Sequence, residues 1–355
     1  MDPYGLRRVV SPRGALPQRA DVLDPALPLG EDELALDVEA LAVDAASFRQ
    51  LEQAARGDPA RVAAEIARIV RARGKLHNPV TGSGGMLLGR VAEVGPRHPA
   101  ASALRPGDRI ATLVSLTLTP LRLDRILAVH PETERVDCVG RAILFASGPW
   151  ARVPADLPEA LALSVLDVCG APALAGRLLR PGQRVLVIGA GKSGALVLAR
   201  ARELVGVGGV LAAADRSRDA LDGVRDAGLC ELALEVDAAD AVATLRAVEG
   251  AGGPFDLVVS CASLPGTELS ALLAVRDGGT VLFFSMATSF TAAALGAEGF
   301  ARDALLLVGN GYVPGHAELA LDLVRRTPAL RDLLARRAAA TPTVRPAPAP
   351  APAGS

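Results

Sequence analysis

Cysteine is scarce in this sequence of 355 residues, and each cysteine stands alone. The chain has no Cys-x-x-Cys pair; the four cysteines are Cys138, Cys169, Cys230 and Cys261. Such spacing argues against a disulfide framework and against a structural zinc lobe. The first twelve residues place Asp2, Arg7 and Arg8 where a signal peptide would need an apolar segment. We therefore expect a protein of the reducing cytoplasm.

An excess of charge of either sign is also lacking, because 38 basic and 39 acidic residues give a formal net charge of −1. No bulk charge attracts nucleic acid or an anionic membrane surface, so we expect a small-molecule substrate. The longest charge-free run, residues 278–297, is interrupted by Gly, Ser and Thr and begins like a strand. We do not predict a membrane-spanning helix there.

The length predicts two domains, since single domains usually hold about 100–200 residues. The first 150 residues consist of short β-like runs separated by Pro and Gly, with one helical stretch over 59–73. From residue 157 helical and strand patterns alternate, with strands expected at 184–188, 210–214, 255–260 and 279–284. This alternation predicts a parallel sheet with helices on both faces.

We therefore expect a β-rich catalytic domain over 1–150 and a doubly wound α/β domain over 151–300. Residues 301–340 contain a further strand and helix, which either extend the parallel sheet or return to the first domain. The Pro/Ala-rich run 341–355 cannot bury much surface and is expected to be a disordered tail.

A glycine-rich motif follows the first strand of the alternating region. The string Gly189-Ala190-Gly191-Lys192-Ser193-Gly194 matches G-x-G-x-x-G and opens a helical pattern. Its glycines permit a tight turn, close approach to a pyrophosphate and close packing of helix on strand. A P-loop is excluded, because Leu186 occupies the position where that motif needs glycine. We expect a dinucleotide site, with Lys192 directed toward the pyrophosphate or the domain cleft.

An acidic residue follows the second strand at the spacing expected for ribose binding. Asp215 lies about twenty residues beyond the last motif glycine, and its carboxylate favours NAD by repelling a 2′-phosphate. Arg216 and Arg218 leave NADP open, because arginine beside that position can hold the phosphate. Ser260 and Ser285, at the ends of the two later strands, are further candidates for contact with the cofactor.

The order of the parts and three strings resemble the medium-chain dehydrogenase/reductase family. Met86–Gly95 ends in a Glu-Val-Gly turn, Leu104–Ile110 contains Pro-Gly-Asp-Arg, and Arg180–Gln183 precedes the nucleotide-binding strand. The resemblance implies a GroES-like catalytic domain followed by an NAD(P)-binding Rossmann domain, and it covers nearly the whole chain except the tail.

The zinc ligands of that family are missing from this sequence. Asp44 and its neighbours stand where the early cysteine ligand is expected, and Gly84-Gly85-Met86 replaces a Gly-His-Glu string. The four histidines are isolated and form no H-x-x-H or H-E-x-x-H pair: His77, His98, His130 and His316. We predict an enzyme without catalytic zinc.

The string Lys75–Leu87 resembles a zinc-independent branch of the family that acts on an amino acid of lysine fermentation. The resemblance implies NAD(P)-dependent oxidative deamination at C3 of a hexanoate that carries a second amine at C5. It implies a 5-amino-3-oxo acid, ammonium and reduced cofactor as products. Such a substrate has two ammonium groups, and each needs a partner when it leaves water.

Four residues are candidates for this chemistry. Only Lys75 and Lys192 are lysine, and Lys75 is expected to transfer a proton or bind the substrate carboxylate, unless it is a solvated residue at a helix end. His77 has a suitable intrinsic pKa for a base, although it could equally cap a turn. Asp44 and Asp167 are candidates to bind the second ammonium. Asp167 could instead be held by a buried hydrogen bond.

Further contacts and rival functions remain open from the sequence. Thr81 and Ser83 lie on a Gly-rich loop and could hydrogen-bond the substrate. A zinc-free, NADPH-dependent quinone or enoyl reductase is the main alternative, but it has no need of the acidic and basic candidates. A non-enzymatic cofactor-binding role is a second alternative. We expect a homodimer or a homotetramer.

Overall fold

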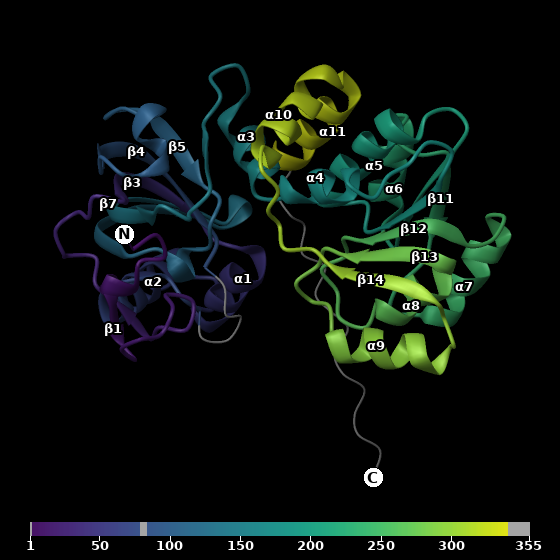
Figure 1. Ribbon diagram of the computed structural model, residues 1–355, viewed down its shortest axis with the longest axis horizontal. Coiled ribbons are helices and arrows are strands. Elements are labelled where there is room, and N and C mark those ends of the chain that lie inside the picture. Colours follow the sequence, from purple (N-terminus) through teal and green to yellow (C-terminus); the bar gives the residue numbers. More distant parts are fainter. Residues whose placement is uncertain (1, 79–83, 340–355) are drawn as a thin grey trace, which may run out of the picture. The chain divides into compact units, whose positions relative to one another are not determined.

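The computed structural model describes residues 2–78 and 84–339 and divides the chain into two compact units. Unit 1 comprises Met1–Val153 with Ala339–Ser355, and unit 2 comprises Pro154–Ala338. The tail expected over 341–355 lies outside the described residues. Figure 1 shows the ribbon of both units, with labels on many of the helices and strands.

Unit 1 is built on an antiparallel β-sheet. Its strands follow the order β6-β7-β3-β4-β5-β8 and pair antiparallel throughout. Their bounds are β3 (Glu33–Ala42), β4 (Met86–Val94), β5 (Arg109–Thr112), β6 (Leu121–His130), β7 (Arg135–Phe145) and β8 (Trp150–Arg152). A separate two-stranded sheet pairs β1 (Val9–Ser11) with β2 (Val22–Leu23).

Two α-helices pack on this sheet, where the sequence pattern predicted one. The predicted helix is α2 (Pro59–Arg73), which buries Val62, Ile66 and Val70 and begins at the N-cap Asp58. The expectation of a single helical stretch was wrong, because α1 (Ala45–Ala54) precedes it. Asp44 is the N-cap of α1, so the helix begins at the candidate site residue itself.

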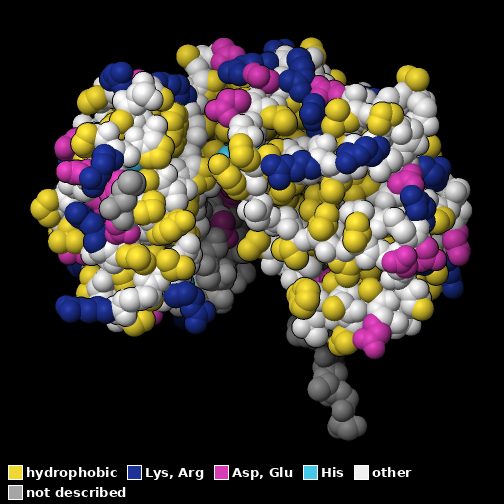
Figure 2. All heavy atoms as spheres, in the orientation of Figure 1, with side chains coloured by type: hydrophobic (Ala, Val, Ile, Leu, Met, Phe, Trp, Pro, Cys, Tyr) yellow, Lys and Arg dark blue, Asp and Glu magenta, His cyan; other side chains and the backbone are white. Residues whose placement is uncertain are grey.

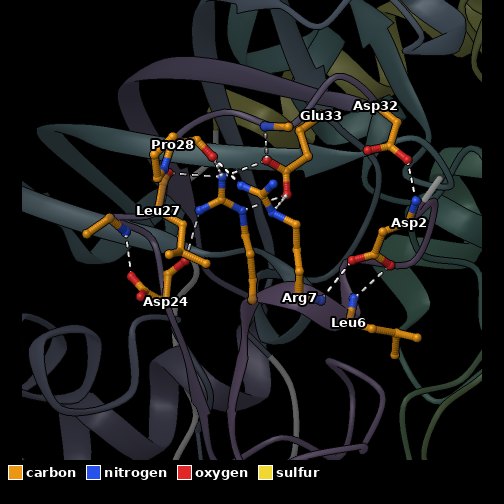
Figure 3. Close-up of polar contacts among 11 residues, drawn as sticks. Asp2, Leu6, Arg7, Asp24, Leu27, Pro28, Asp32 and Glu33 are labelled. Carbon is orange, nitrogen blue, oxygen red and sulfur yellow. Dashed lines mark hydrogen bonds and ion pairs between the residues drawn. The ribbon is translucent and has the colours of Figure 1, made fainter.

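A buried ion pair anchors the N-terminal segment to the sheet of unit 1. Arg8 and Glu33 are almost completely buried and join through Nε–Oε1 and Nη2–Oε2 contacts of 2.7 and 2.6 Å. Arg8 also donates to the carbonyl oxygens of Asp24 and Leu27. Figure 3 shows Asp24, Leu27 and Pro28 in the surroundings of the Glu33 carboxylate. Removing one partner of such a buried ion pair destabilises the fold, because the other charge is left buried without a partner. Residues 9–28 are thereby held against the sheet at their two ends.

Unit 2 is a parallel sheet of six strands in the order β11-β10-β9-β12-β13-β14. The bounds are β9 (Arg184–Ile188), β10 (Val210–Asp215), β11 (Leu232–Glu235), β12 (Phe255–Ser260), β13 (Val275–Phe283) and β14 (Ala304–Val308). In chain order this is 3-2-1-4-5-6, the doubly wound order, which reverses direction between β9 and β12. The predicted parallel sheet is therefore confirmed, and β14 extends it rather than returning to unit 1.

Helices cover both faces of this sheet, as Figure 1 shows with α4 to α6 on one face and α7 to α9 on the other. The helices are α3 (Glu159–Leu166), α4 (Gly170–Gly176), α5 (Lys192–Val205), α6 (Arg218–Asp226), α7 (Ala241–Gly250), α8 (Glu268–Ala274), α9 (Phe290–Gly299), α10 (His316–Arg326) and α11 (Pro328–Ala339). The apolar stretch after residue 157 is broken at Asp167–Cys169, so it forms α3 and α4 rather than one helix. Strand β13 starts at Val275, earlier than the expected 279, because a register shift admits extra residues beside β12.

The described residues contain no single helix that is long and apolar enough to cross a membrane. Helices α3 and α4 meet that test of length and composition only when they are taken together, and they are bent by 48° at the break between them.

Candidate functional site

The glycine-rich turn lies at the carboxyl end of β9, beside the point where the strand order reverses. Gly189 has a φ of 96°, and a Cβ there would lie 2.7 Å from the backbone nitrogen of Ala262. A Cβ on Gly194 would lie 1.9 Å from the carbonyl oxygen of Gly189. These two glycines are required by close packing of turn, helix and strand.

Gly191 is different, because its surroundings are open. It is the N-cap of α5, and a Cβ added to it would meet no heavy atom within 4 Å. The first backbone N–H groups of α5 have no partners within the helix, and the helix dipole favours an anion beside them. Lys192 and the half-buried Ser193 occupy the first turn of this helix. The turn therefore offers open space and unpaired donors to a phosphate.

Asp215 lies at the end of β10 and is bound to the same turn. Its Oδ2 accepts from the backbone N–H of Ala190 at 2.8 Å, and its Oδ1 accepts from that of Ser217 at 2.8 Å. A carboxylate has about four acceptor positions, so both oxygens keep capacity for a ribose hydroxyl. Arg216 is exposed beside it, whereas Arg218 donates from Nη1 to Glu235 Oε2 at 2.7 Å.

The two candidate serines lie at the carboxyl ends of neighbouring strands, β12 and β13. The hydroxyl of Ser260 is fully buried and has no hydrogen-bond partner among the described residues. The Ser285 hydroxyl accepts from the backbone N–H of Ala287 at 3.1 Å, and its own N–H donates to the Ser260 carbonyl. Ser260 borders the switch point of the sheet, where doubly wound folds bind ligands, and Ser285 lies one strand further away.

The structure brings Lys192 and Asp167 together, although 25 residues separate them in the chain. Lys192 Nζ donates to Asp167 Oδ2 at 3.0 Å, and both side chains are about two-fifths exposed. Asp167 is the C-cap of α3, at the break before α4. The carboxylate is therefore engaged by a lysine, and its expected availability for a substrate ammonium depends on displacing that lysine.

Lys75 is buried in unit 1 and is not the solvated helix-end residue that was one alternative. Gly74 ends α2 with φ 61°, and a Cβ there would lie 1.9 Å from the carbonyl oxygen of Leu23. Lys75 follows directly, has no exposed surface, and donates from Nζ to the Pro17 carbonyl at 2.9 Å. Burial, together with the positive charge of Arg73, lowers the pKa of Lys75 to about 8.

His77 lies within electrostatic reach of Lys75. Its pKa is lowered, first by burial and then by the positive charges of Lys75 and Arg73, while Asp21 opposes the shift. Its Nδ1 is buried and has no hydrogen-bond partner among the described residues. The shift favours the neutral imidazole, and no described residue forms a hydrogen bond with its Nδ1.

Asp44 combines a structural contact with an unused acceptor. Its Oδ1 accepts from the Ser47 N–H at 3.0 Å and caps α1. Its Oδ2 is buried and has no partner in the described structure. The packing of Gly85, whose Cβ would lie 2.8 Å from the Asp44 nitrogen, places the segment that replaces the zinc ligand beside it. A buried carboxylate oxygen without a donor is costly unless a ligand supplies one.

Two predicted contacts, Thr81 and Ser83, lie outside the described residues. Within residues 2–78 and 84–339, no group of three or more His, Cys, Asp or Glu side chains is arranged to hold a metal ion. The absence of catalytic zinc therefore stays a prediction.

One residue that contacts the turn was not predicted from the sequence. Arg337, on α11, donates to the carbonyl oxygen of Ala190 at 2.8 Å. No local pattern marks it, because it lies 147 residues beyond its partner in a helix with several arginines. Only the docking of α11 brings it to the turn.

A nucleotide-binding sheet with this strand order, preceded by an antiparallel β-domain, defines a dehydrogenase of the medium-chain class. The turn, the open space at Gly191 and the oriented Asp215 fit a nicotinamide dinucleotide. An alcohol dehydrogenase from Thermotoga maritima has the same fold, with a TM-score of 0.53 at 14% identity over 87% of this chain and 85% of that one. The expected pairing of a GroES-like domain with a Rossmann domain is confirmed.

Comparison with curated proteins narrows the class to one family. Residues 7–154 match the model of the L-erythro-3,5-diaminohexanoate dehydrogenase N-terminal domain. The L-erythro-3,5-diaminohexanoate dehydrogenase of Acetoanaerobium sticklandii is 44% identical over 92% of this chain and 96% of its own length. That of Fusobacterium nucleatum is 44% identical over 93% and 96%. The chain belongs to the L-erythro-3,5-diaminohexanoate dehydrogenase family.

Proposed function

We propose that this chain oxidatively deaminates L-erythro-3,5-diaminohexanoate with NAD, giving 5-amino-3-oxohexanoate and ammonium in lysine degradation. Similarity to the two curated relatives over more than nine-tenths of the chain supports the reaction. The structural observation that carries the proposal is the Oδ2 of Asp44, which is buried and has no hydrogen-bond partner among the described residues. The second ammonium group of the substrate would supply a donor to this oxygen.

The cofactor would be held by residues of unit 2. Gly191 and the first turn of α5 would face the pyrophosphate, and Asp215 would accept from the adenosine ribose. A nicotinamide held there would supply the acceptor for the hydride that leaves C3 of the substrate. We propose NAD rather than NADP, because the Asp215 carboxylate repels a 2′-phosphate and Arg218 is engaged by Glu235. The exposed Arg216 is the residue through which NADP would bind.

His77 would act as the base of the reaction, and Lys75 would tune the pKa of His77. Conversion of an ammonium-bearing carbon, water and oxidised cofactor to ketone, ammonium ion and reduced cofactor releases one proton overall. The C3 ammonium must lose a proton before C3 can release hydride, so a neutral base is needed. His77 is kept neutral by burial and by Lys75, which fits that role. Lys75 has no exposed surface, so we assign it to tuning His77 rather than to contact with substrate.

Replacing Asp44 with Asn tests the ammonium-binding role. Asparagine is as good an N-cap as aspartate, so α1 should persist while the charge is lost. We expect KM for the diamino acid to rise about 10- to 150-fold, corresponding to about 1.5–3 kcal/mol for a charge-assisted hydrogen bond. KM for 3-aminohexanoate, which lacks the second amine, should change little. Asp58→Asn is the matched control, because Asp58 caps α2 in the same way.

Two outcomes would contradict the proposal. Equal KM changes for both amino acids would show that Asp44 does not bind the second ammonium. Failure of the unmodified protein to reduce NAD or NADP with the diamino acid, combined with NADPH-dependent reduction of a quinone or an enoyl thioester, would favour the zinc-free reductase alternative.

We further propose that the protein is a cytoplasmic homodimer joined through β14. This strand is an edge of the parallel sheet, and Leu305, Leu307 and Val308 on it are 66%, 37% and 73% exposed. Figure 2 shows hydrophobic side chains over this part of unit 2. An uncharged apolar edge strand is prone to pair, and a two-fold axis allows β14 to pair with its own copy.

Size-exclusion chromatography with light scattering tests this interface. Leu305→Lys should yield monomers, whereas Leu127→Lys should not, although Leu127 is 55% exposed on the edge strand β6. A monomeric unmodified protein, or a Leu305→Lys variant that keeps its mass, would refute the β14 interface. A tetramer that falls to dimers in this variant would require a second interface.

A further inference from the structure

Arg337 is a charged residue that the proposed chemistry does not use, and it holds the centre of the glycine-rich turn. Its Nη1 donates to the Ala190 carbonyl at 2.8 Å, and its Nη2 donates to the Ala220 carbonyl at 3.1 Å. Ala190 is completely buried, and its own N–H is taken by Asp215 at 2.8 Å. Ala190 of the glycine-rich turn is thus bound through its N–H by Asp215, at the end of β10, and through its C=O by Arg337 of α11.

The chain makes room for this contact. A Cβ on Gly223 of α6 would lie 2.9 Å from Leu333 Cδ1 and 3.3 Å from Arg337 Nη2. Leu330, Leu333 and Leu334 are buried, so they fix α11 beside the turn. The packing of α11 therefore positions the Arg337 guanidinium, and the absence of a side chain at Gly223 lets α11 lie close to α6.

The hydrogen bond from Arg337 to the Ala190 carbonyl also affects the direction of the next backbone N–H. In a trans peptide the C=O and the following N–H point in opposite directions. Holding the Ala190 carbonyl toward Arg337 therefore directs the Gly191 N–H to the opposite side. The Gly191 Cα also borders open space, because a Cβ built on it would meet no heavy atom within 4 Å.

The charge of Arg337 also fits an anion at the turn. Burial lowers the pKa of Arg337, while the Asp215 carboxylate opposes that shift. A partly desolvated guanidinium that is bound to carbonyl oxygens produces a positive potential around the turn. An anion bound at the turn would offset the free-energy cost of burying the Arg337 guanidinium.

We infer that Arg337 is a positioning residue for the diphosphate of the cofactor, acting through the Ala190 carbonyl to orient the Gly191 N–H. This role deepens the proposed function, because it rests on dinucleotide binding at the turn. Arg337 need not touch the cofactor, and it is not a catalytic residue.

Calorimetric titration of NADH, ADP and adenosine into three variants tests the inference. Arg337→Met should weaken NADH and ADP by the same factor, about tenfold, as expected for one charge-assisted hydrogen bond. Adenosine lacks the diphosphate, so its affinity should not change. Arg337→Lys keeps a charge and one donor and should recover part of the loss. Arg336→Met is the matched control, because Arg336 is exposed on the same helix.

Kinetics separate positioning from chemistry. With Arg337→Met, KM for the cofactor should rise about tenfold, while kcat at saturating cofactor stays within about twofold. Unchanged NADH and ADP affinity would overturn the inference. So would an equal loss for adenosine, which would mean that Arg337 only supports the fold. Absence of NADH and NADPH binding to the unmodified protein would instead contradict the proposed function.

Discussion

Titration of Lys75 is the prediction that the structure specifies most fully. Its amine is buried against the Pro17 carbonyl, and its pKa is lowered from 10.5 to about 8. This shift corresponds to about 3 kcal/mol that disfavours the charged form in the folded protein. The residue should therefore exchange its proton near pH 8, whereas a solvated lysine does so above pH 10.

Nuclear magnetic resonance of protein labelled with [ε-13C]lysine measures this directly, because the chain has only two lysines. Lys192→Arg removes one signal and assigns the other to Lys75. The Lys75 signal should titrate with a midpoint close to pH 8. A midpoint at pH 10 or above would refute the burial that this reasoning requires.

The same shift has a signed effect on stability. Between pH 8 and 10.5 the unfolded chain holds a proton on Lys75 that the folded chain has lost. The contribution of Lys75 to the free energy of unfolding therefore rises with pH across this window, by at most about 3 kcal/mol. Denaturation of the wild type and of Lys75→Met should show their difference move in favour of the wild type from pH 7.5 to 10.5. A constant difference would contradict the shift.

Three further predictions concern the cofactor, the metal and the base. Asp215→Ala should weaken NAD about 10-fold or more but NADP much less, since a charge-assisted hydrogen bond to the ribose is lost; equal effects in a binding titration would remove the ribose assignment. Activity should survive chelation with less than one zinc per chain by elemental analysis, and a stoichiometric zinc whose removal abolishes turnover would disprove this. The acid limb of kcat/KM should lie below the ordinary histidine pKa of about 6.5 and move to higher pH in Lys75→Met, because the charge that lowers the pKa of His77 is gone. An unmoved limb would exclude His77 as the base that Lys75 tunes.

Local patterns were sufficient to predict the parts of the fold that depend on neighbours in the chain. Helix α2 was predicted with its bounds, because its apolar residues recur at helical spacing between Asp58 and Gly74. The turn at Gly189 was predicted because a buried strand, glycines at fixed spacing and a helix follow one another. Helix α1 was missed, since Phe48 and Leu51 are its only large apolar residues and too few to mark a helical period.

Sequence alone determined the architecture, the dinucleotide turn and the family, because the patterns that indicate each of them lie in contiguous segments of the chain. Tertiary structure decided what the charged residues do, because their partners are remote in sequence. Burial by the segment around Pro17 makes Lys75 a group that titrates near pH 8, across 58 residues. Docking of α11 brings Arg337 to Ala190 across 147 residues, and the break after α3 turns Asp167 toward Lys192. Electrostatic and hydrogen-bond energies depend on distance and solvent exposure, which no linear pattern records.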